Sequence, residues 1–147
     1  MQPQPKNDLV YLLTILEAAG KINIYRSGFT DAFDFYNAND QLYFNASLLL
    51  IATIGDHVAK INPATREKYL SIPWQQIKGM RNRIAHDYTG VDCEFIFEIV
   101  TNEVPRLTED IEKLVRAELR TRLFSYEELE IAKNSTWYRH VNFANLF

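Results

Sequence analysis

Residues 41–61 read QLYFNASLLLIATIGDHVAKI and form the most apolar stretch of the chain. Apolar residues recur there three and four positions apart, which is the spacing of one face of an α-helix. Asn39 or Asp40 can cap the start of this helix, and Asn62-Pro63 ends it after Ile61. We predict that this helix is the centre of the core. The expected core face is Leu42, Ala46, Leu49, Leu50, Thr53, Ile54 and Val58.

The segments on both sides of this helix are also helical in pattern. Asn7 or Asp8 can cap a first helix that stops near Gly28, and Thr30 opens a short second helix. After residues 62–63 we expect a polar link. The next helix begins in Ser71-Ile72-Pro73-Trp74, because proline is favourable where a missing N–H has no helical partner.

The C-terminal half predicts a long helix, a short helix and an aromatic tail. Asp92 can cap a helix that continues to Leu114, and Pro105 should bend it by removing one hydrogen bond. The sequence from Ser125 to Glu128 has the form of a capping box and opens a last helix. We expect the tail to pack on its own bundle through aromatic side chains. These are Trp137, Tyr138, Phe143 and Phe147.

The fold class that follows is all-α, because no segment alternates polar and apolar residues as a strand does. The expected architecture is an up-and-down helical bundle with a C-terminal helical and aromatic extension. We find no internal repeat and no Gly/Ser linker. Residues 1–147 therefore read as a single domain.

Composition excludes several classes of protein. A chain of 147 residues with 47% hydrophobic residues can bury one core, which excludes a two-domain enzyme. The net charge of -3 argues against a nonspecific nucleic-acid coat. The single cysteine, Cys93, reads as a core or helix-start thiol. With no apolar run long enough to span a bilayer and no signal sequence, we expect a soluble cytoplasmic protein without membrane partners.

Familiar catalytic motifs are missing from the chain. It has no glycine-rich phosphate loop, and its three histidines do not form an HExxH zinc motif. Hydride transfer, NTP hydrolysis and metalloproteolysis are therefore disfavoured. We expect no metal and no cofactor.

Residues 72–92, IPWQQIKGMRNRIAHDYTGVD, concentrate four potential cations in an acidic chain: Lys78, Arg81, Arg83 and His86. An Arg guanidinium matches phosphate oxygens and stays charged. A His transfers protons near neutral pH. Metal-free RNA cleavage by 2′-hydroxyl attack needs these two capacities.

Helical geometry relates these side chains to one another. Arg81 and His86 lie about 140° apart on an ideal helix, whereas Asn82 and His86 lie nearly one above the other. Arg81 and Tyr88, seven apart, would share a face. A two-fold dimer could offer two Arg and two His to one cleft. The alternative is structural: Arg81 reaches a surface carboxylate and His86 caps carbonyls at the helix end.

This stretch resembles the HEPN superfamily, and within it the HepT-type ribonuclease toxins. The resemblance rests on Arg81 and His86 with four residues between them, on the polar Asn82 after the arginine, and on Tyr88 two residues after the histidine. An apolar helix that ends in Ile-Gly-acidic, here residues 54–56, is also typical. The resemblance covers about residues 8–115 as the core, and the extension of about 116–147 has no counterpart.

The resemblance implies a metal-independent endoribonuclease toxin that acts on RNA as a homodimer, with Arg81 and His86 as catalytic residues. It also implies an MntA-type minimal nucleotidyltransferase antitoxin that neutralises the toxin by AMPylation of Tyr88, as in type VII toxin–antitoxin pairs.

The surrounding side chains have supporting roles in this reading. Asn82, Arg83, Lys78 and Asp56 are the candidates for supporting the site and binding RNA. The alternative is a catalytically silent HEPN interaction module that docks a nucleotidyltransferase partner.

Overall fold

The computed structural model describes residues 8–147, and every regular element in that range is helical, which confirms the all-α prediction. Asn7, one of the two predicted caps, lies outside the described residues. No helix among those described is long and apolar enough to cross a membrane. The elements in chain order are α1 (Asp8–Arg26), α2 (Ala32–Val58), α3 (Pro63–Lys68), α4 (Trp74–His86), η1 (Tyr88–Gly90), α5 (Cys93–Glu98), η2 (Ile99–Glu103), α6 (Val104–Arg120), α7 (Tyr126–Lys133) and η3 (Phe143–Asn145).

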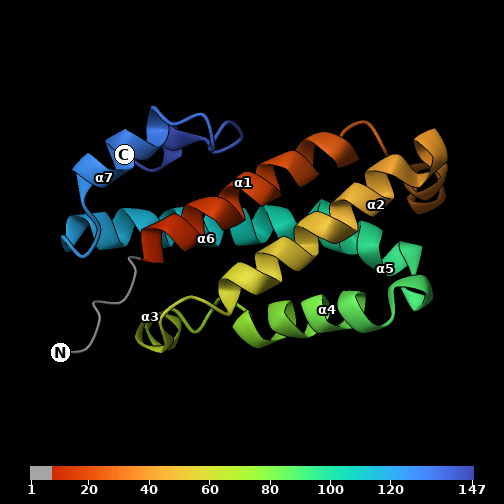
Figure 1. The fold of residues 1–147 in the computed structure, drawn as a ribbon, viewed down its shortest axis with the longest axis horizontal. Helices are drawn as coiled ribbons and strands as arrows, with labels where there is room; N and C mark the ends of the chain where they lie inside the picture. The colour runs from red at the N-terminus through yellow and green to blue at the C-terminus, as the bar shows by residue number, and fades with distance from the viewer. Residues whose placement is uncertain (1–7) are drawn as a thin grey trace.

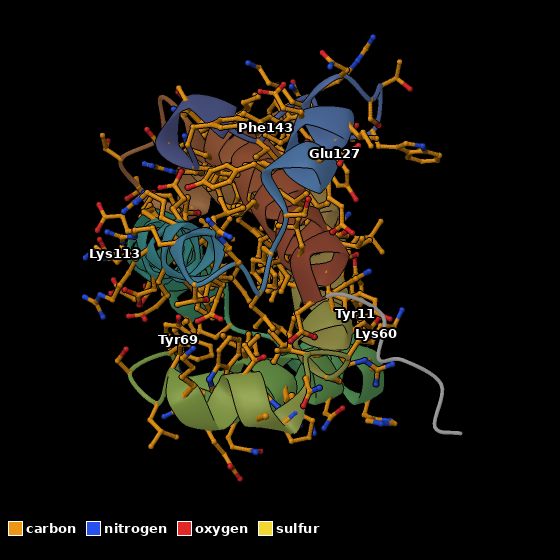
Figure 2. All side chains as sticks on the ribbon, turned by 90° about the vertical axis from the view of Figure 1, so that its left-hand side faces the viewer. Tyr11, Lys60, Tyr69, Lys113, Glu127 and Phe143 are labelled. Carbon is orange, nitrogen blue, oxygen red and sulfur yellow. The ribbon has the colours of Figure 1, made fainter. Side chains whose placement is uncertain are left out.

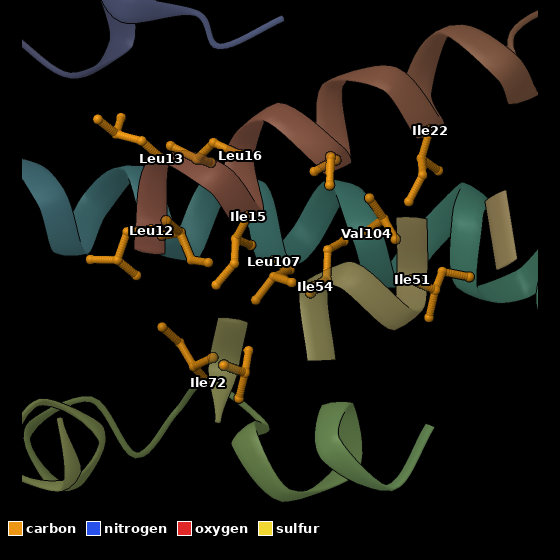
Figure 3. Packing of buried hydrophobic residues seen from close by; sticks show 14 of the residues in the cluster. Leu12, Leu13, Ile15, Leu16, Ile22, Ile51, Ile54, Ile72, Val104 and Leu107 are labelled. Atoms are coloured by element: carbon orange, nitrogen blue, oxygen red, sulfur yellow. The ribbon is translucent and has the colours of Figure 1, made fainter. Parts of the chain in front are cut away.

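The core lies between α1, α2 and α6. Helix α1 packs on both α2 and α6, and α4 packs on the far side of α2 (Figure 1). Figure 3 shows Ile15 of α1, Ile54 of α2 and Leu107 of α6 pointing into the space between these helices. Ile72, just before α4, closes the core from below in the same view. Burial of these aliphatic side chains supplies the main driving force for the fold.

Helix α2 does form the centre of the bundle, but its buried face differs from the predicted one. Leu42 and Leu49 are 59% and 68% exposed, so their assignment to the core was wrong. Apolar residues occur on several sides of this helix, and spacing alone fitted two registers. The side chains that are buried include Phe44, Leu48, Ile51, Ile54 and Val58.

An interruption of α2 lies where the sequence predicted a helix start. Asn39, Asp40 and Gln41 have positive φ angles of 49°, 55° and 68° inside the helical run. Asn and Asp tolerate this conformation better than other non-glycine residues. The short preceding segment is capped by Asp31, one residue after the predicted Thr30, since its carboxylate accepts from Phe33 N–H and Asp34 N–H.

The polar link expected after residues 62–63 is instead a helix, so that prediction was wrong. Helix α2 ends at Val58 rather than Ile61, and Pro63 opens α3. Asn62 caps α3 by accepting from Ala64 N–H at 3.0 Å. The buried Asp8 carboxylate accepts from Asn62 N–H at 3.0 Å and from the Thr65 hydroxyl at 2.6 Å. Pro63 thus acts as a first-turn residue, and Asp8 fixes α3 to the start of α1.

A buried polar group, called the Glu118 cluster here, joins the end of α3 to α6. Glu118 is buried and accepts from Lys68 Nζ at 2.6 Å and from the Tyr69 hydroxyl. Burial alone would raise the pKa of Glu118, but the hydrogen bonds from Lys68 and Tyr69 hold it below its ordinary value. Burial and the neighbouring carboxylate raise the pKa of Tyr69. Tyr69 lies between the α3–α4 layer and α6 (Figure 2).

The predicted bend near Pro105 takes the form of a wide helical turn. Asp92 caps α5 as predicted, accepting from Glu94 N–H at 2.9 Å. The long helix is then divided by a π-helical turn, η2, that immediately precedes Pro105 in the first turn of α6. A wider turn accommodates the ring, which would clash with a regular α-helical carbonyl. Helix α6 continues to Arg120, so the extension boundary expected near residue 116 falls inside a helix.

The C-terminal tail folds back over α1 and α6, opposite α4 (Figures 1 and 2). Ser125 caps α7 as predicted, accepting from Glu127 N–H and Glu128 N–H. The Glu17 carboxylate binds both the backbone N–H and the imidazole of His140 at 2.6 Å. Phe143 packs into the bundle, but Trp137 is 81% exposed, so its predicted packing was wrong.

Candidate active site

Helix α4 approaches α2 closely because Gly55 has no side chain. A Cβ atom at that position would overlap the Cβ of Arg81 and lie 3.2 Å from the carbonyl oxygen of Ile77. Such contacts cannot be accommodated without a shift of one helix against the other. The Ile-Gly-acidic sequence at residues 54–56 therefore has a physical meaning: it brings the backbone of α2 against the arginine of α4.

Arg81 is oriented by the residue that follows this glycine. Its Nε donates to Asp56 Oδ1 at 2.6 Å, and its Nη1 donates to Asn82 Oδ1 at 3.3 Å. The two charged side chains are 39% and 49% exposed, so the ion pair is a surface one worth about 0–1 kcal/mol. Nη2 of the Arg81 guanidinium remains available to a ligand. A phosphate can also compete with Asp56 and Asn82 for Nε and Nη1, because these surface contacts are weak. Part of the structural alternative thus holds, since Arg81 does reach a surface carboxylate.

His86 is the last residue of α4, and its side chain is exposed. Within residues 8–147 its imidazole makes no hydrogen bond or ion pair, so the predicted alternative of carbonyl capping is not seen. Asn82, one turn earlier on the same side of the helix, is exposed as well. The ring nitrogens of His86 are therefore available for hydrogen bonds to a ligand.

Tyr88 does not share a helical face with Arg81, so that expectation was wrong. Helix α4 ends at His86, and Tyr88 lies in the following turn, η1. Its hydroxyl donates to Asn45 Oδ1 at 2.6 Å, and the side chain is 49% exposed. Nothing in the local sequence indicates Asn45, which lies far away in the chain. Asn45 and Asp56 are eleven residues apart on α2, about 16 Å along one side of that helix.

The other candidate residues occupy the flanks of α4. Lys78 is half-buried, and the guanidinium of Arg83 lies over the ring of Phe95, 5.5 Å from its centroid.

Cys93 begins α5, where burial and the neighbouring Asp92 and Glu94 raise the pKa of its thiol. A raised pKa keeps the thiol protonated, so Cys93 is a poor nucleophile. Among residues 8–147, no three His, Cys, Asp or Glu side chains lie together as metal ligands would.

The end of α4 thus combines a partly exposed arginine, an unpartnered histidine and an accessible tyrosine on a small helical bundle. We call Arg81, Asn82, His86 and Tyr88 the α4 end cluster. Arginine and histidine at this spacing on an all-α fold agree with the HEPN resemblance of the sequence. The family comparison is more specific, because residues 15–114 match the family described as ribonuclease HepT-like. The chain belongs to this HepT-like family.

Named relatives agree with the family. The chain is 32% identical over 114 residues to "Putative RNase MJ0125" of Methanocaldococcus jannaschii, a match that covers 76% of this chain and 95% of the relative. It is 30% identical over 79 residues to "Putative RNase TTE0752" of Caldanaerobacter subterraneus, covering 54% and 70% of the two chains. "Probable ribonuclease HepT" of Thermococcus cleftensis is 29% identical over 69 residues, covering 47% and 63%. No solved structure gives a significant match.

Proposed function

We propose that the chain is a metal-independent endoribonuclease in which Arg81 and His86 are the catalytic residues. The observation that carries this proposal is the unpartnered imidazole of His86 beside the exposed Asn82, one and a half turns after Arg81. Membership of the HepT-like ribonuclease family supports it.

The chemistry requires only a base, an acid and charge stabilisation. The imidazole takes the proton of a ribose 2′-hydroxyl, the 2′-oxygen attacks the adjacent phosphorus, and the bond from phosphorus to the 5′-oxygen breaks. An imidazolium gives its proton to that departing oxygen, leaving a 2′,3′-cyclic phosphate and a free 5′-hydroxyl. The guanidinium of Arg81 stabilises the extra negative charge on the pentacovalent phosphorus. Asp56 acts as a positioning residue, since it holds Nε of Arg81.

A homodimer would supply two imidazoles and two guanidiniums to one cleft. In one chain Arg81 faces α2 whereas His86 is exposed at the helix end, about 140° around the helix. Two copies related by a two-fold axis would place His86 of one chain and Arg81 of the other at the same phosphate, and that imidazole would serve first as base and then, once protonated, as acid.

The activity is tested with purified protein and a labelled RNA in EDTA. We expect cleavage with cyclic-phosphate ends, and none with His86→Ala prepared in parallel. Cleavage at the parent rate by the His86→Ala protein would exclude this mechanism.

The shared cleft is tested by mixing inactive variants. If Arg81→Ala and His86→Ala subunits exchange into mixed dimers, each mixed cleft keeps one arginine and one histidine, and partial activity should return. A silent mixture in which mixed dimers are shown to form would contradict a shared cleft.

We further propose that the chain is the toxin of a toxin–antitoxin pair and that an MntA-type nucleotidyltransferase silences it at Tyr88. The Tyr88 oxygen would attack the α-phosphorus of ATP, and pyrophosphate would leave. The half-exposed ring and the single hydrogen bond to Asn45 leave the hydroxyl accessible. The added AMP would bring about one negative charge close to the end of α4 and compete with RNA for its cations.

The modification is tested by incubation with the nucleotidyltransferase and ATP. We expect the mass of one AMP or more on Tyr88 and a loss of RNA cleavage. Tyr126 is a matched control, because it is also 49% exposed. Tyr88→Phe should escape modification and silencing, whereas Tyr126→Phe should behave as the parent protein. Equal modification of Tyr88→Phe would contradict the assignment.

The alternative function is a silent module that docks the nucleotidyltransferase. The ion pair between Arg81 and Asp56 favours it, since a structural arginine would also make that pair. Protein that binds the partner but leaves RNA intact in the partner's absence would establish this alternative.

A further inference from the structure

A cavity of about 510 Å³ lies between α4 and the segment formed by α5, η2 and the start of α6. Ile77 and Met80 line it from α4, and Phe95 and Ile99 line it from the other side. Its walls are therefore largely apolar and include one aromatic ring. None of these residues belongs to the α4 end cluster, although Ile77 and Met80 lie on the same helix as Arg81 and His86.

Phe95 connects the cavity to the cationic end of α4. Its side chain is 42% exposed, and the guanidinium of Arg83 lies over the ring, 5.5 Å from the centroid. Arg83 and His86 are three residues apart, so they are neighbours on the surface of the helix. Unpaired nucleobases bind to exposed aromatic rings and to arginine side chains. Phe95 and Arg83 provide both, and Arg83 lies within one helical turn of the candidate catalytic His86.

The charges around the cavity favour a base over a phosphate. Its rim carries the carboxylates of Glu98, Glu103 and Asp110, and Arg106 is paired with Glu103 at 3.6 Å. These carboxylates repel a phosphate but accept hydrogen bonds from the amino groups of a base. The side chain of Arg81 does not line the cavity and is instead available to the sugar–phosphate backbone.

We propose that Phe95, together with Arg83, forms a stacking subsite that holds one unpaired nucleobase in this cavity, next to the phosphate that is cleaved. The inference rests on the proposed ribonuclease function and adds to it a position for one base of the RNA. A base in a duplex is already stacked on its neighbours, whereas an unpaired base is free to stack on the Phe95 ring.

The subsite is tested in the cleavage-deficient His86→Ala protein with short RNA oligonucleotides. Phe95→Ala should weaken binding of single-stranded RNA by about five- to hundred-fold, the range of one base–aromatic stack. Phe95→Trp should restore it, and its fluorescence should be quenched by RNA beyond the response of the parent protein. Phe33 is a matched control, since it is 55% exposed at the start of α2, and Phe33→Ala should change nothing.

An oligonucleotide with a single abasic position separates stacking from a general structural effect. Moving the abasic position along the RNA should find one place where the parent protein loses affinity and Phe95→Ala does not. Equal loss on intact and abasic RNA would overturn the subsite, as would unchanged binding by Phe95→Ala. Sedimentation of Phe95→Leu reveals whether the ring serves only to hold two copies together, and a lost dimer with normal RNA affinity would also overturn it.

Two further outcomes would show that the cavity binds a protein partner or that the chain is not a ribonuclease. A cationic helical peptide whose binding depends on Phe95, with RNA binding unaffected, would assign the cavity to a protein partner and overturn the proposal. Failure of the unsubstituted protein to cleave RNA at all would instead refute the ribonuclease function, independently of Phe95.

Discussion

The Glu118 cluster and the α4 end cluster use similar residue types in opposite ways. Each combines a tyrosine with charged or ionisable side chains. Glu118 is 1% exposed, and both Lys68 and Tyr69 donate to it. At the end of α4, by contrast, Arg81 is paired only at the surface and His86 has no partner within residues 8–147.

This difference distinguishes polar side chains that stabilise the fold from polar side chains that are available to bind a ligand. A buried charge is tolerated only when its hydrogen bonds are satisfied, so the buried Glu118 carboxylate is engaged by its donors within the fold. The α4 end cluster keeps donors and a titratable ring in water, where they contribute little to stability but can bind and transfer protons. We therefore expect substitutions in the first region to change stability and substitutions in the second to change activity.

The largest expected effect is that of His86→Ala on RNA cleavage. Loss of the group that transfers the protons should reduce the rate by about 10² to 10⁴-fold. The melting temperature should stay within about 1 °C of the parent protein, because exposed side chains without partners contribute little to stability. The two measurements are a cleavage assay and a thermal melt of the same preparation. A large drop in melting temperature would place His86 with the structural residues.

Arg81→Lys should come next, with a loss of about ten- to hundred-fold in cleavage. Lysine keeps the charge but lacks the planar fork that binds Asp56, Asn82 and a phosphate together. The melting temperature should again change little, since a surface ion pair is worth at most about 1 kcal/mol. If lysine restored full activity, charge alone would suffice and the orientation by Asp56 would be unimportant.

Glu118→Gln should produce the reverse outcome. We expect the free energy of unfolding to fall by about 1–3 kcal/mol, because two donors lose a charged acceptor in the interior. Cleavage per folded molecule should be unchanged. Urea unfolding and an active-site titration measure the two quantities. Glu130 on α7 is exposed, so Glu130→Gln is the matched substitution that should leave stability unaltered.

The same variant makes a prediction about pH. The pKa of Glu118 is held below its ordinary value in the folded chain, so the unfolded chain binds the proton more readily. The stabilisation is present above the ordinary glutamate pKa of about 4.3 and is lost as pH falls through the folded value. The stability difference between the parent and Glu118→Gln should shrink below about pH 4. A constant difference from pH 7 to pH 3 would contradict it.

Asp56→Asn should have the smallest effect, a few-fold decrease in cleavage. The amide still accepts a hydrogen bond from Nε of Arg81 but without charge, so the guanidinium is less firmly oriented. Because this residue acts through another, the double variant with Arg81→Lys should lose no more than Arg81→Lys alone. Additive losses would show that Asp56 acts independently of Arg81.

Local sequence signals predicted the parts of the molecule that local chemistry determines. The helical periodicity and the caps at Asp92 and Ser125 are confirmed, and the backbone departs from helical geometry at Asn39 and Asp40, where a helix start was predicted. The spacing of Arg81 and His86 on one helix is confirmed too. Each of these depends on residues within a turn or two of one another.

Long-range contacts could not be read in this way. The bond from Tyr88 to Asn45 joins positions that are 43 residues apart, and the fit of Gly55 against Arg81 depends on how two helices pack. Helix α3 was missed because Pro63 was interpreted as a terminator rather than as a first-turn residue. The register of α2 needed knowledge of which neighbours would cover it.

The tail has a practical consequence for experiments on the cleft. Gly20 allows the carbonyl of His140 to lie against α1, and Arg116 holds the carbonyl of Asn145 at 2.5 Å, so the chain end is anchored to α1 and α6. Figure 1 shows that end on the opposite side of the bundle from α4. An affinity tag or surface linker attached after Phe147 would therefore immobilise the protein with the α4 end cluster facing the solution, ready for capture of RNA.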